Sequence, residues 1–318
     1  MHEWQNVNVS GEMVDHSKNV KFCYSVGDVE DSKYCLNLIL GVKDSYDFDT
    51  WGVGCELMYE VLTSGENCQN VKFSWDCWPA DQDVEYSIKC ASSSNLFGCV
   101  GLRKKSFCIL NKQYDRENFM ALRKKIVEHM DSAPYEDKLG RVYKYGEFFP
   151  SEFSPYAYNE TVAEDYFPLT PQDAKNKGYL WREIEIKRVQ TTIDANDLQD
   201  DINDVSEDIR EALVKCSGCR RAYRIIPMEL SFYKKMQISL PRVCPDCRFT
   251  ERIKHRNPPQ YFQRKCYCVG GGSSNMVYKN FALHFHGITP CPNEFLTSYS
   301  PDKKDIVYCK ECYNAEVV

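Results

Sequence analysis

Two pairs of cysteines have the spacing of a metal-binding site. The pairs are Cys216-Ser-Gly-Cys219 and Cys244-Pro-Asp-Cys247, with twenty-four residues between them. A tetrahedral Zn²⁺ site needs four thiolates at about 2.3 Å from one ion, and two short Cys-x-x-Cys knuckles supply them. The pattern therefore predicts a structural zinc site formed by these four cysteines.

Other uses of the four cysteines fit the sequence less well. A disulfide is disfavoured because no secretory signal precedes it, and a thioredoxin-type motif needs one Cys-x-x-Cys beside a βαβ pattern. A structural zinc ion contributes about 10 kcal/mol or more to a small module. We therefore expect this module to unfold without its metal.

A second set of candidate ligands lies near the C-terminus. Cys309-Lys-Glu-Cys312 forms another knuckle, and Cys291 resembles half of a broken partner knuckle. These three cysteines predict a second structural zinc site, which makes two Zn²⁺ ions in the chain. The fourth ligand is ambiguous, and the order of preference is Cys268, Cys266 and His286.

His284-Phe-His286 also permits a different chemistry. Two histidines and an open coordination position could hold a catalytic zinc that hydrolyses phosphodiesters. No glutamate lies at helical spacing from them to act as a general base, and cysteine-rich coordination usually closes a site. We expect no enzymatic activity, with a zinc-dependent nuclease using His284 and His286 as the minor alternative.

The first zinc site lies in a basic segment. Residues 215–265 carry 13 Lys and Arg against three Asp and Glu, interleaved with Tyr223, Phe232, Tyr233, Phe249, Tyr261 and Phe262. Cations that hold phosphates and aromatic rings that stack on bases are typical of nucleic-acid binding. The predicted nucleic-acid-binding residues are Arg220, Arg221, Arg224, Lys234, Lys235, Arg242, Arg248, Arg252, Lys254 and Arg256. The alternative is a solvated face that pairs with the acidic residues 194–208 of the same chain.

The same segment carries a resemblance to known sequences. CSGCRRAYRIIPMELSFYKKMQISLPRVCPDCR, residues 216–248, is similar to a probable zinc-binding ribbon domain with a Cys-x-x-Cys, a Phe-Tyr-lysine helix and a final Cys-Pro-x-Cys-Arg knuckle. From its Cys-rich repeats through YGEFFPSEFSPYAYNET to VYCKECYNAEVV, the chain resembles uncharacterised zinc-ribbon proteins of candidate phyla radiation (Patescibacteria) bacteria. That resemblance implies a fold and no activity. Members of the family begin with an additional N-terminal zinc ribbon, which we do not find here.

The N-terminal third of the chain, which precedes the predicted zinc modules, contains a loose sequence repeat. Between residues 8 and 114, a turn residue followed by alternating aromatics and cysteine recurs roughly every ten residues. A period this short suits one strand and one corner, so about two units would make one coil of a parallel β-solenoid. None of the repeat's cysteines forms a Cys-x-x-Cys, so we expect a buried ladder rather than metal ligands: Cys23, Cys35, Cys55, Cys68, Cys77, Cys90, Cys99 and Cys108.

The remaining segments connect the solenoid to the zinc modules. Asp115 is a candidate N-cap for a helix whose apolar positions Phe119, Leu122, Ile126, Val127 and Met130 would cover the solenoid's open edge. The fold class is therefore mainly β with short helices: a helix-capped solenoid followed by two zinc ribbons. The expected segments are solenoid 1–114, capping helix 115–131, aromatic-rich connector 132–193, acidic boundary and helix 194–214, basic ribbon 215–265 and second ribbon 266–318.

Composition limits the classes of function. The chain has 318 residues, a formal net charge of −6 and 17 cysteines. An odd cysteine count argues against a complete disulfide framework, and no apolar run approaches the roughly 18 residues that span a bilayer. We expect a cytoplasmic protein without a membrane partner or a small-molecule substrate. The leading hypothesis is a zinc protein that binds nucleic acid, with structured RNA favoured; the alternative is a protein-interaction scaffold with purely structural zinc.

Overall fold

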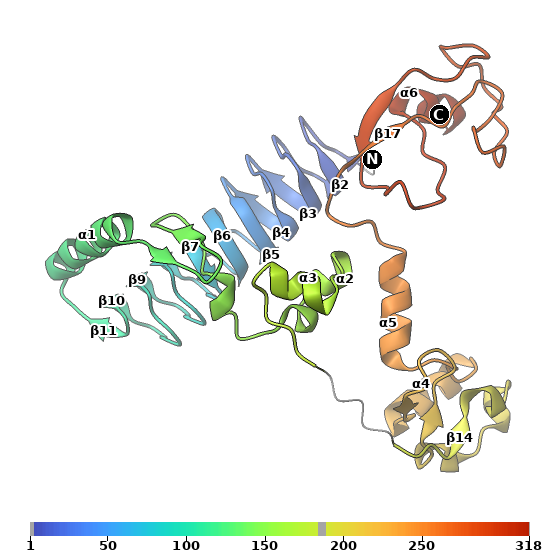
Figure 1. Cartoon of the computed structure of the whole chain (residues 1–318), viewed down its shortest axis with the longest axis horizontal. Helices are drawn as coiled ribbons and strands as arrows, with labels where there is room; N and C mark the ends of the chain where they lie inside the picture. Colours follow the sequence, from blue (N-terminus) through green and yellow to red (C-terminus); the bar gives the residue numbers. More distant parts are fainter. Residues whose placement is uncertain (1–2, 184–188, 318) are drawn as a thin grey trace. The chain divides into compact units, whose positions relative to one another are not determined.

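The computed structural model describes residues 3–183 and 189–317, so a short part of the predicted connector, 184–188, lies outside the described residues (Figure 1). The chain forms two compact units. The first comprises residues 1–155, 176–179 and 259–318, and the second comprises residues 156–175 and 180–258.

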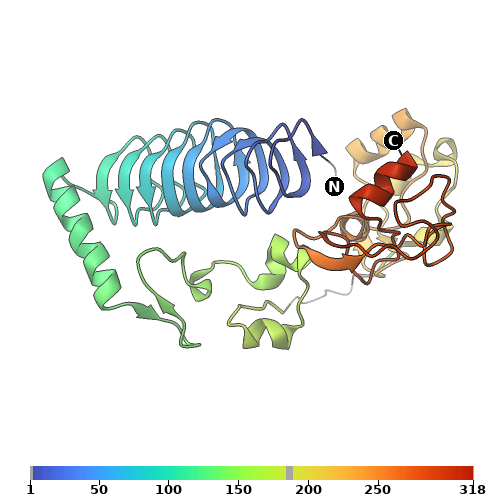
Figure 2. The ribbon, with the colours of Figure 1, turned by 90° about the horizontal axis from the view of Figure 1, so that it is seen from above.

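The first unit contains the predicted parallel β-solenoid, which has about eight turns (Figure 2). Successive strands pair in parallel along one sheet, and only the last pair is antiparallel. The strands are β1 (Glu3–Trp4), β2 (Gly11–Asp15), β3 (Cys23–Glu30), β4 (Leu36–Lys43), β5 (Tyr46–Gly52), β6 (Glu56–Gly65), β7 (Gln69–Trp75), β8 (Gln82–Glu85), β9 (Ser94–Phe97), β10 (Ser106–Ile109) and β11 (Lys112–Gln113).

One sequence repeat closes one coil, so the prediction of about two repeats per coil was wrong. Gly11 pairs with Cys23, and Glu56 pairs with Gln69, which gives 12 or 13 residues per turn. The physical reason is a three-residue period along the chain: in one coil the buried positions are Val14, Ser17, Val20 and Cys23. Between them the backbone has left-handed residues such as Asn19 and Phe22, whose φ angles are 54° and 53°.

The eight cysteines of the solenoid are core residues, as predicted. Each has at most 2% of its surface exposed. Their sulfurs contact backbone carbonyls, and the Cys35 amide donates to Cys23 Sγ in the previous coil at 3.2 Å. Among the described residues, none of the eight belongs to a group that could hold a metal ion.

Helix α1 (Arg116–Ser132) caps the end of the solenoid, as predicted. The Asn118 amide donates to the N-cap side chain of Asp115 at 2.9 Å. Phe119 is buried with Phe97 and Ile109 of the last coils. Burial of this cluster protects apolar side chains at the solenoid's open end.

The chain after α1 packs back on the solenoid. Arg123 donates to both carboxylate oxygens of Glu85 at 2.8 Å, and the Tyr145 hydroxyl donates to the same carboxylate at 3.0 Å. The Gly146 amide donates to the Tyr86 hydroxyl at 3.0 Å. The short elements of residues 135–176 are β12 (Tyr135–Glu136), β13 (Val142–Tyr143), η1 (Ser151–Phe153), η2 (Tyr158–Glu160), α2 (Val162–Tyr166) and α3 (Pro171–Asn176).

The second unit contains the first ribbon and the acidic segment in one core. Ala195, Leu198, Ile202 and Val205 of the acidic segment are buried together with residues of the ribbon such as Leu230. The segment predicted as a boundary with a helix instead forms three 3₁₀ turns, because Asp194, Asp201 and Ser206 each cap one turn through the side chain. The elements are β14 (Ile193–Asp194), η3 (Ala195–Asp197), η4 (Ile202–Asp204), η5 (Glu207–Arg210), β15 (Val214–Lys215), β16 (Ala222–Tyr223), α4 (Pro227–Met236) and α5 (Pro245–Lys254).

The C-terminal module belongs to the first unit and has little regular structure. Strands β17 (Phe262–Lys265) and β18 (Glu294–Thr297) form an antiparallel pair, and α6 (Lys310–Val317) ends the described chain. The module's buried cluster consists of five cysteines, with Phe295 and Tyr308 packed against them. A core of this composition supplies little apolar burial.

Candidate metal centres

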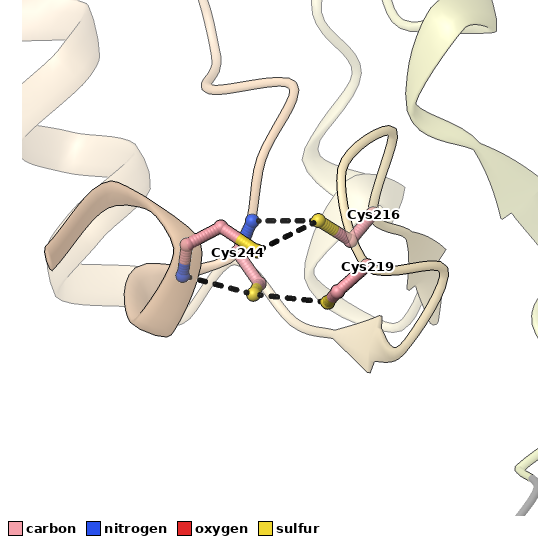
Figure 3. A group of neighbouring side chains, drawn as sticks. Cys216, Cys219 and Cys244 are labelled. Carbon is pink, nitrogen blue, oxygen red and sulfur yellow. Dashed lines mark hydrogen bonds between the residues drawn. The ribbon is translucent and has the colours of Figure 1, made fainter. Parts of the chain in front are cut away.

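The first four predicted ligands converge. Cys216 and Cys219 lie in the turn between β15 and β16, and Cys244 and Cys247 lie at the start of α5. Figure 3 shows the sulfurs of Cys216, Cys219 and Cys244 turned toward one another. Cys216 Sγ lies 3.9 Å from Cys247 Sγ, and Cys219 Sγ lies 3.6 Å from Cys244 Sγ.

These separations distinguish a metal site from a disulfide. A disulfide joins its sulfurs at about 2.05 Å, and all 17 cysteines of the chain are free. Two thiolates bound at about 2.3 Å to one tetrahedral ion lie about 3.8 Å apart, which is close to the sulfur separations found here. The group Cys216, Cys219, Cys244 and Cys247 could therefore hold a metal ion.

Hydrogen-bond donors surround this group and lower the pKa of Cys216 and Cys219, whereas burial raises the pKa of Cys244 and the neighbouring sulfurs raise that of Cys247 to about 12. The Cys244 amide donates to Cys216 Sγ at 3.2 Å, and the Cys247 amide donates to Cys244 Sγ at 3.5 Å. The Arg221 guanidinium donates to Cys219 Sγ at 3.3 Å and lowers the pKa of Cys219 to about 6. Amide and guanidinium donors stabilise the charged form of a ligand sulfur.

A second group forms around the C-terminal knuckle. Cys291 Sγ lies 3.8 Å from Cys309 Sγ and 3.7 Å from Cys312 Sγ. The fourth member is Cys266 at the end of β17, where its amide donates to Asn293 and its sulfur accepts from the Cys309 amide at 3.2 Å. All four cysteines are buried, and the group could hold a metal ion.

The sequence had favoured Cys268 over Cys266 as the fourth member of that group. The structure differs because Cys268 belongs with the loop that follows it: Asn280 Nδ2 donates to Cys268 Sγ at 3.2 Å. Cys268 lies in a third group that could hold a metal ion, together with His284, His286 and Cys312. Cys312 is thus a member of two groups.

The sequence assigned His284 only to the nuclease alternative, and the structure places it beside His286. Their rings stack with centroids 5.4 Å apart. His284 Nε2 lies 2.9 Å from Glu316 Oε1, and His286 Nε2 lies 3.3 Å from Cys312 Sγ. The His-x-His pattern was the available sign of this group, and in the structure it begins a turn in which the Gly287 amide donates to the His284 carbonyl at 2.9 Å.

The acidic segment neutralises much of the predicted basic surface. Lys215 pairs with Asp194 at 3.1 Å, and Lys234 pairs with Glu207 at 2.6 Å. Residues 194–256, which share one core, contain 12 Lys and Arg and 11 Asp and Glu. The folded module is therefore close to neutral, as the alternative interpretation of the basic segment predicted.

Other predicted nucleic-acid-binding residues have partners inside the ribbon or its connector. Arg221 pairs with Asp246, Arg242 with Asp200, Arg248 with Glu229 and Lys254 with Glu251, and the Arg256 guanidinium lies 5.6 Å from the Tyr166 ring centroid. Among the described residues, four of the predicted cations make no side-chain ion pair or hydrogen bond: Arg220, Arg224, Lys235 and Arg252.

Of the aromatic residues predicted to stack on bases, some are buried or packed within the protein and others are exposed. Tyr223 and Tyr233 are buried in the ribbon core, and Tyr261 packs against the rings of Phe22 and Tyr24 within the first unit. Phe232 and Phe249 are exposed. Only a small part of the predicted aromatic surface is thus open to a ligand.

Comparisons of this chain with protein-family models, with curated proteins and with solved structures found no match. The resemblance to the candidate phyla radiation proteins therefore rests on the quoted motifs. Among the described residues, no helix combines the length and the apolar character that a membrane crossing requires.

Proposed function

We propose that this chain is a non-enzymatic, zinc-stabilised interaction scaffold whose partners are proteins. The observation that carries the proposal is the exposed apolar surface of both metal-binding modules. On α4, Leu230 and Tyr233 face the core, whereas Met228, Phe232 and Met236 are 76%, 53% and 54% exposed on the opposite side. These three residues, four positions apart along one helix face, form what we call the α4 stripe.

The C-terminal module has a comparable surface in the loop that carries the two histidines. Phe281, Leu283 and Ile288 are 85%, 99% and 92% exposed. Clustered apolar side chains on a soluble surface are typical of protein-interaction sites, and methionine-rich surfaces suit partners of varied shape. Each proposed ion would hold such a surface in place.

The charges beside the α4 stripe define the chemistry of its partner. Lys235 lies beside Met236 at the end of α4, and Arg224 lies before its start; neither pairs with a carboxylate within the described residues. The complementary surface is an apolar helix or groove with acidic residues at its rim. The near-neutral charge of residues 194–256 favours this partner over a polyanion.

We propose Zn²⁺ as the metal. A tetrahedral set of four thiolates suits zinc or iron, and a mixture of histidine and cysteine ligands is typical of structural zinc. Seventeen free cysteines also suit a reducing compartment such as the cytoplasm.

A second candidate function is binding of RNA, which a narrower observation favours. Phe249 and Arg252 are exposed one turn apart on α5, and Arg220, Arg224 and Lys235 form no side-chain ion pair among the described residues. An exposed ring next to free cations can stack on a base and contact phosphates. This interpretation involves four of the ten predicted cations.

Two matched variants of the full chain separate these functions. The first replaces the α4 stripe with serine (M228S/F232S/M236S), and the second replaces the four unpaired cations with serine (R220S/R224S/K235S/R252S). Neither set includes a candidate metal ligand, so both variants should keep the wild-type zinc content and circular dichroism. Those two measurements serve as the folding control.

The wild type and both variants are purified from native cells, with and without nuclease, and binding of each captured protein is repeated with purified components. The proposal expects direct binding that survives nuclease, is lost at least tenfold in the stripe variant and is weakened less in the cation variant, which removes only the charges of Arg224 and Lys235 at the rim of the stripe. Partners released by nuclease, together with salt-sensitive RNA binding that only the cation variant loses, would instead establish the RNA function.

A further inference from the structure

Cys312 lies at the meeting point of two groups of candidate ligands. Its sulfur is 3.7 Å from Cys291 Sγ on one side and 3.3 Å from His286 Nε2 on the other. Ligands of one tetrahedral zinc ion lie about 3.8 Å apart when both are sulfur and about 3.5 Å apart when one is nitrogen. The sulfur of Cys312 therefore has suitable separations from ligands of both groups.

We propose that the C-terminal module binds two Zn²⁺ ions that share the Cys312 thiolate as a bridging ligand. Cys266, Cys291, Cys309 and Cys312 hold the first ion, and Cys268, His284, His286 and Cys312 hold the second. The chain then carries three ions, one more than the knuckle spacing predicted. This inference concerns the metal site alone and does not depend on the proposed partner.

His284 supplies independent support for the second ion. Its side chain is fully buried, and its Nε2 lies 2.9 Å from the equally buried Glu316 carboxylate. A carboxylate partner keeps the proton on Nε2 and leaves the lone pair on Nδ1. Nδ1 is buried without a hydrogen-bond partner in the described chain, and such a group destabilises the fold unless a ligand satisfies it.

His286 is oriented in a similar way through its other nitrogen. Its Nδ1 lies 2.6 Å from the Thr289 carbonyl oxygen, which can only accept, so the proton is on Nδ1. The lone pair is then on Nε2, the atom nearest to Cys312 Sγ. Both histidines thus have one nitrogen fixed by an oxygen and the other directed to the metal group, as is usual for metal-ligating histidines.

Glu316 is a positioning residue for this site. Besides His284, its carboxylate accepts from the amides of Phe281 and Ala282 and from the Tyr278 hydroxyl, at 3.0 to 3.2 Å. These bonds tie α6 to the loop that carries the histidines. They also occupy the carboxylate, which makes it a poor general base.

The charge of the buried cluster also favours two ions. Five buried cysteines surround the site, and the donors to their sulfurs include side-chain amides of Asn280 and Asn293 rather than cations. One ion with four thiolates leaves a net charge of about −2, whereas two ions with five thiolates leave about −1. Because buried charge is costly, the second ion reduces the cost of ionising the fifth cysteine.

A bridging Cys312 also decides the chemistry of the second ion. With four protein ligands the ion is closed, as structural zinc sites are, and no position remains for water. Without Cys312 it would keep three protein ligands and an open position, which is the arrangement that the nuclease alternative requires.

The experiment measures metal content and connectivity in the full chain. Elemental analysis should give three zinc ions per chain, two in H284A/H286A and two in C219A/C244A, which removes only the first ribbon's ion. In protein loaded with ¹¹³Cd, two resonances should be coupled to each other through the bridging sulfur. The ribbon's resonance should be uncoupled, which provides an internal control.

Glu316→Gln tests the positioning role separately. It should weaken binding of the second C-terminal ion by about 10- to 100-fold in chelator competition and leave the other two ions in place. Two ions in the wild type, or three ions whose cadmium resonances show no mutual coupling, would overturn the bridged centre. Because the cadmium measurement uses the unaltered chain, misfolding of a variant cannot hide that result.

Discussion

The solenoid and the two metal-binding modules use cysteine in opposite ways. In the solenoid, eight cysteines occupy regular inward positions, and their sulfurs contact carbonyls, as Cys68 Sγ contacts the Gly65 carbonyl at 3.2 Å. In the modules, nine cysteines lie in irregular segments, turns and helix starts, and their sulfurs gather with those of other cysteines, or with histidine nitrogens, in groups of four that could hold a metal ion. The backbone around a cysteine, more than its burial, decides whether it acts as a small apolar residue or as a ligand.

The two regions also differ in what stabilises them. The solenoid has a continuous buried core from Val14 to Cys108 and a ladder of backbone hydrogen bonds between coils. The C-terminal module has a buried cluster that is almost entirely cysteine. Apolar burial should therefore maintain the first region without metal, whereas the second should depend on its ions.

Metal removal should give the largest difference between the regions. With a strong chelator and an alkylating agent under native conditions, nine thiols should react, and the eight in the solenoid should stay protected. The reason is that metal contributes on the order of 10 kcal/mol to a small zinc module and nothing to the solenoid. Mass spectrometry of the alkylated peptides checks the count. Alkylation of Cys55 or Cys77 at the same rate as Cys244 would contradict the comparison.

A cavity in the solenoid core should destabilise the solenoid and leave the metal-binding modules unchanged. Phe48 is fully buried in the column that also contains Cys35 and Val61. Phe48→Ala should destabilise the solenoid by about 3–5 kcal/mol because it leaves a cavity in a narrow core. Urea unfolding followed by tryptophan fluorescence measures this loss, and the zinc content should stay at the wild-type value. Release of metal at urea concentrations below the unfolding transition would mean that the stability of the metal-binding modules depends on the solenoid.

The parts of this fold that the sequence predicted depend on local patterns. Each knuckle is four residues long, helix α4 begins at Pro227, and the cysteine repeat marks the solenoid. The one-repeat coil was missed because each repeat was taken as one strand and one corner, which is too little for a full coil. Serines such as Ser17 and Ser32 fill other inward positions, and they carry the three-residue period that gives the coil length.

The parts that the sequence did not predict depend on residues distant in the chain. The third ligand group joins Cys268 to Cys312 and needs Glu316 to orient His284, and no spacing rule covers such a set. Charge pairing was only the alternative interpretation of the basic segment, because the ribbon is neutralised by a segment that precedes it. Leu198, Ile202 and Val205, recurring among the aspartates, were the sign that this segment packs in a core.

Arg242 tests whether the acidic segment stabilises the ribbon beyond the metal. Its Nη1 donates to the carbonyls of Ala195 and Leu198 at 2.7 and 2.6 Å, and its Nη2 lies 2.5 Å from Asp200. Arg242→Ala leaves the Leu198 carbonyl without its donor and the Ala195 carbonyl with only the Leu198 amide at 3.4 Å, so we expect a loss of about 2 kcal/mol in the second unit with zinc retained. Thermal unfolding at fixed zinc concentration measures it. Arg252→Ala, at an exposed residue, is the control and should change stability by less than about 0.5 kcal/mol.

The smallest expected effect concerns a carboxylate inside the solenoid. Asp81 is fully buried, one of its oxygens has no partner in the described chain, and burial raises its pKa to about 6. A raised pKa means that the folded state prefers the protonated acid. Its contribution is therefore favourable below the unfolded-state pKa near 4 and is lost as the pH rises toward 6.

Asp81→Asn should therefore stabilise the solenoid at neutral pH. We expect a gain of about 1 kcal/mol, less than the full ionisation penalty, because the new amide also lacks one partner. Urea unfolding near pH 5 and near pH 8 checks the sign, since the gain should shrink at the lower pH, where the wild-type carboxyl is protonated. Equal gains at both pH values would show that the pKa of Asp81 is the same in the folded and unfolded states. A loss near pH 8 would mean that the carboxylate has a partner that offsets its burial.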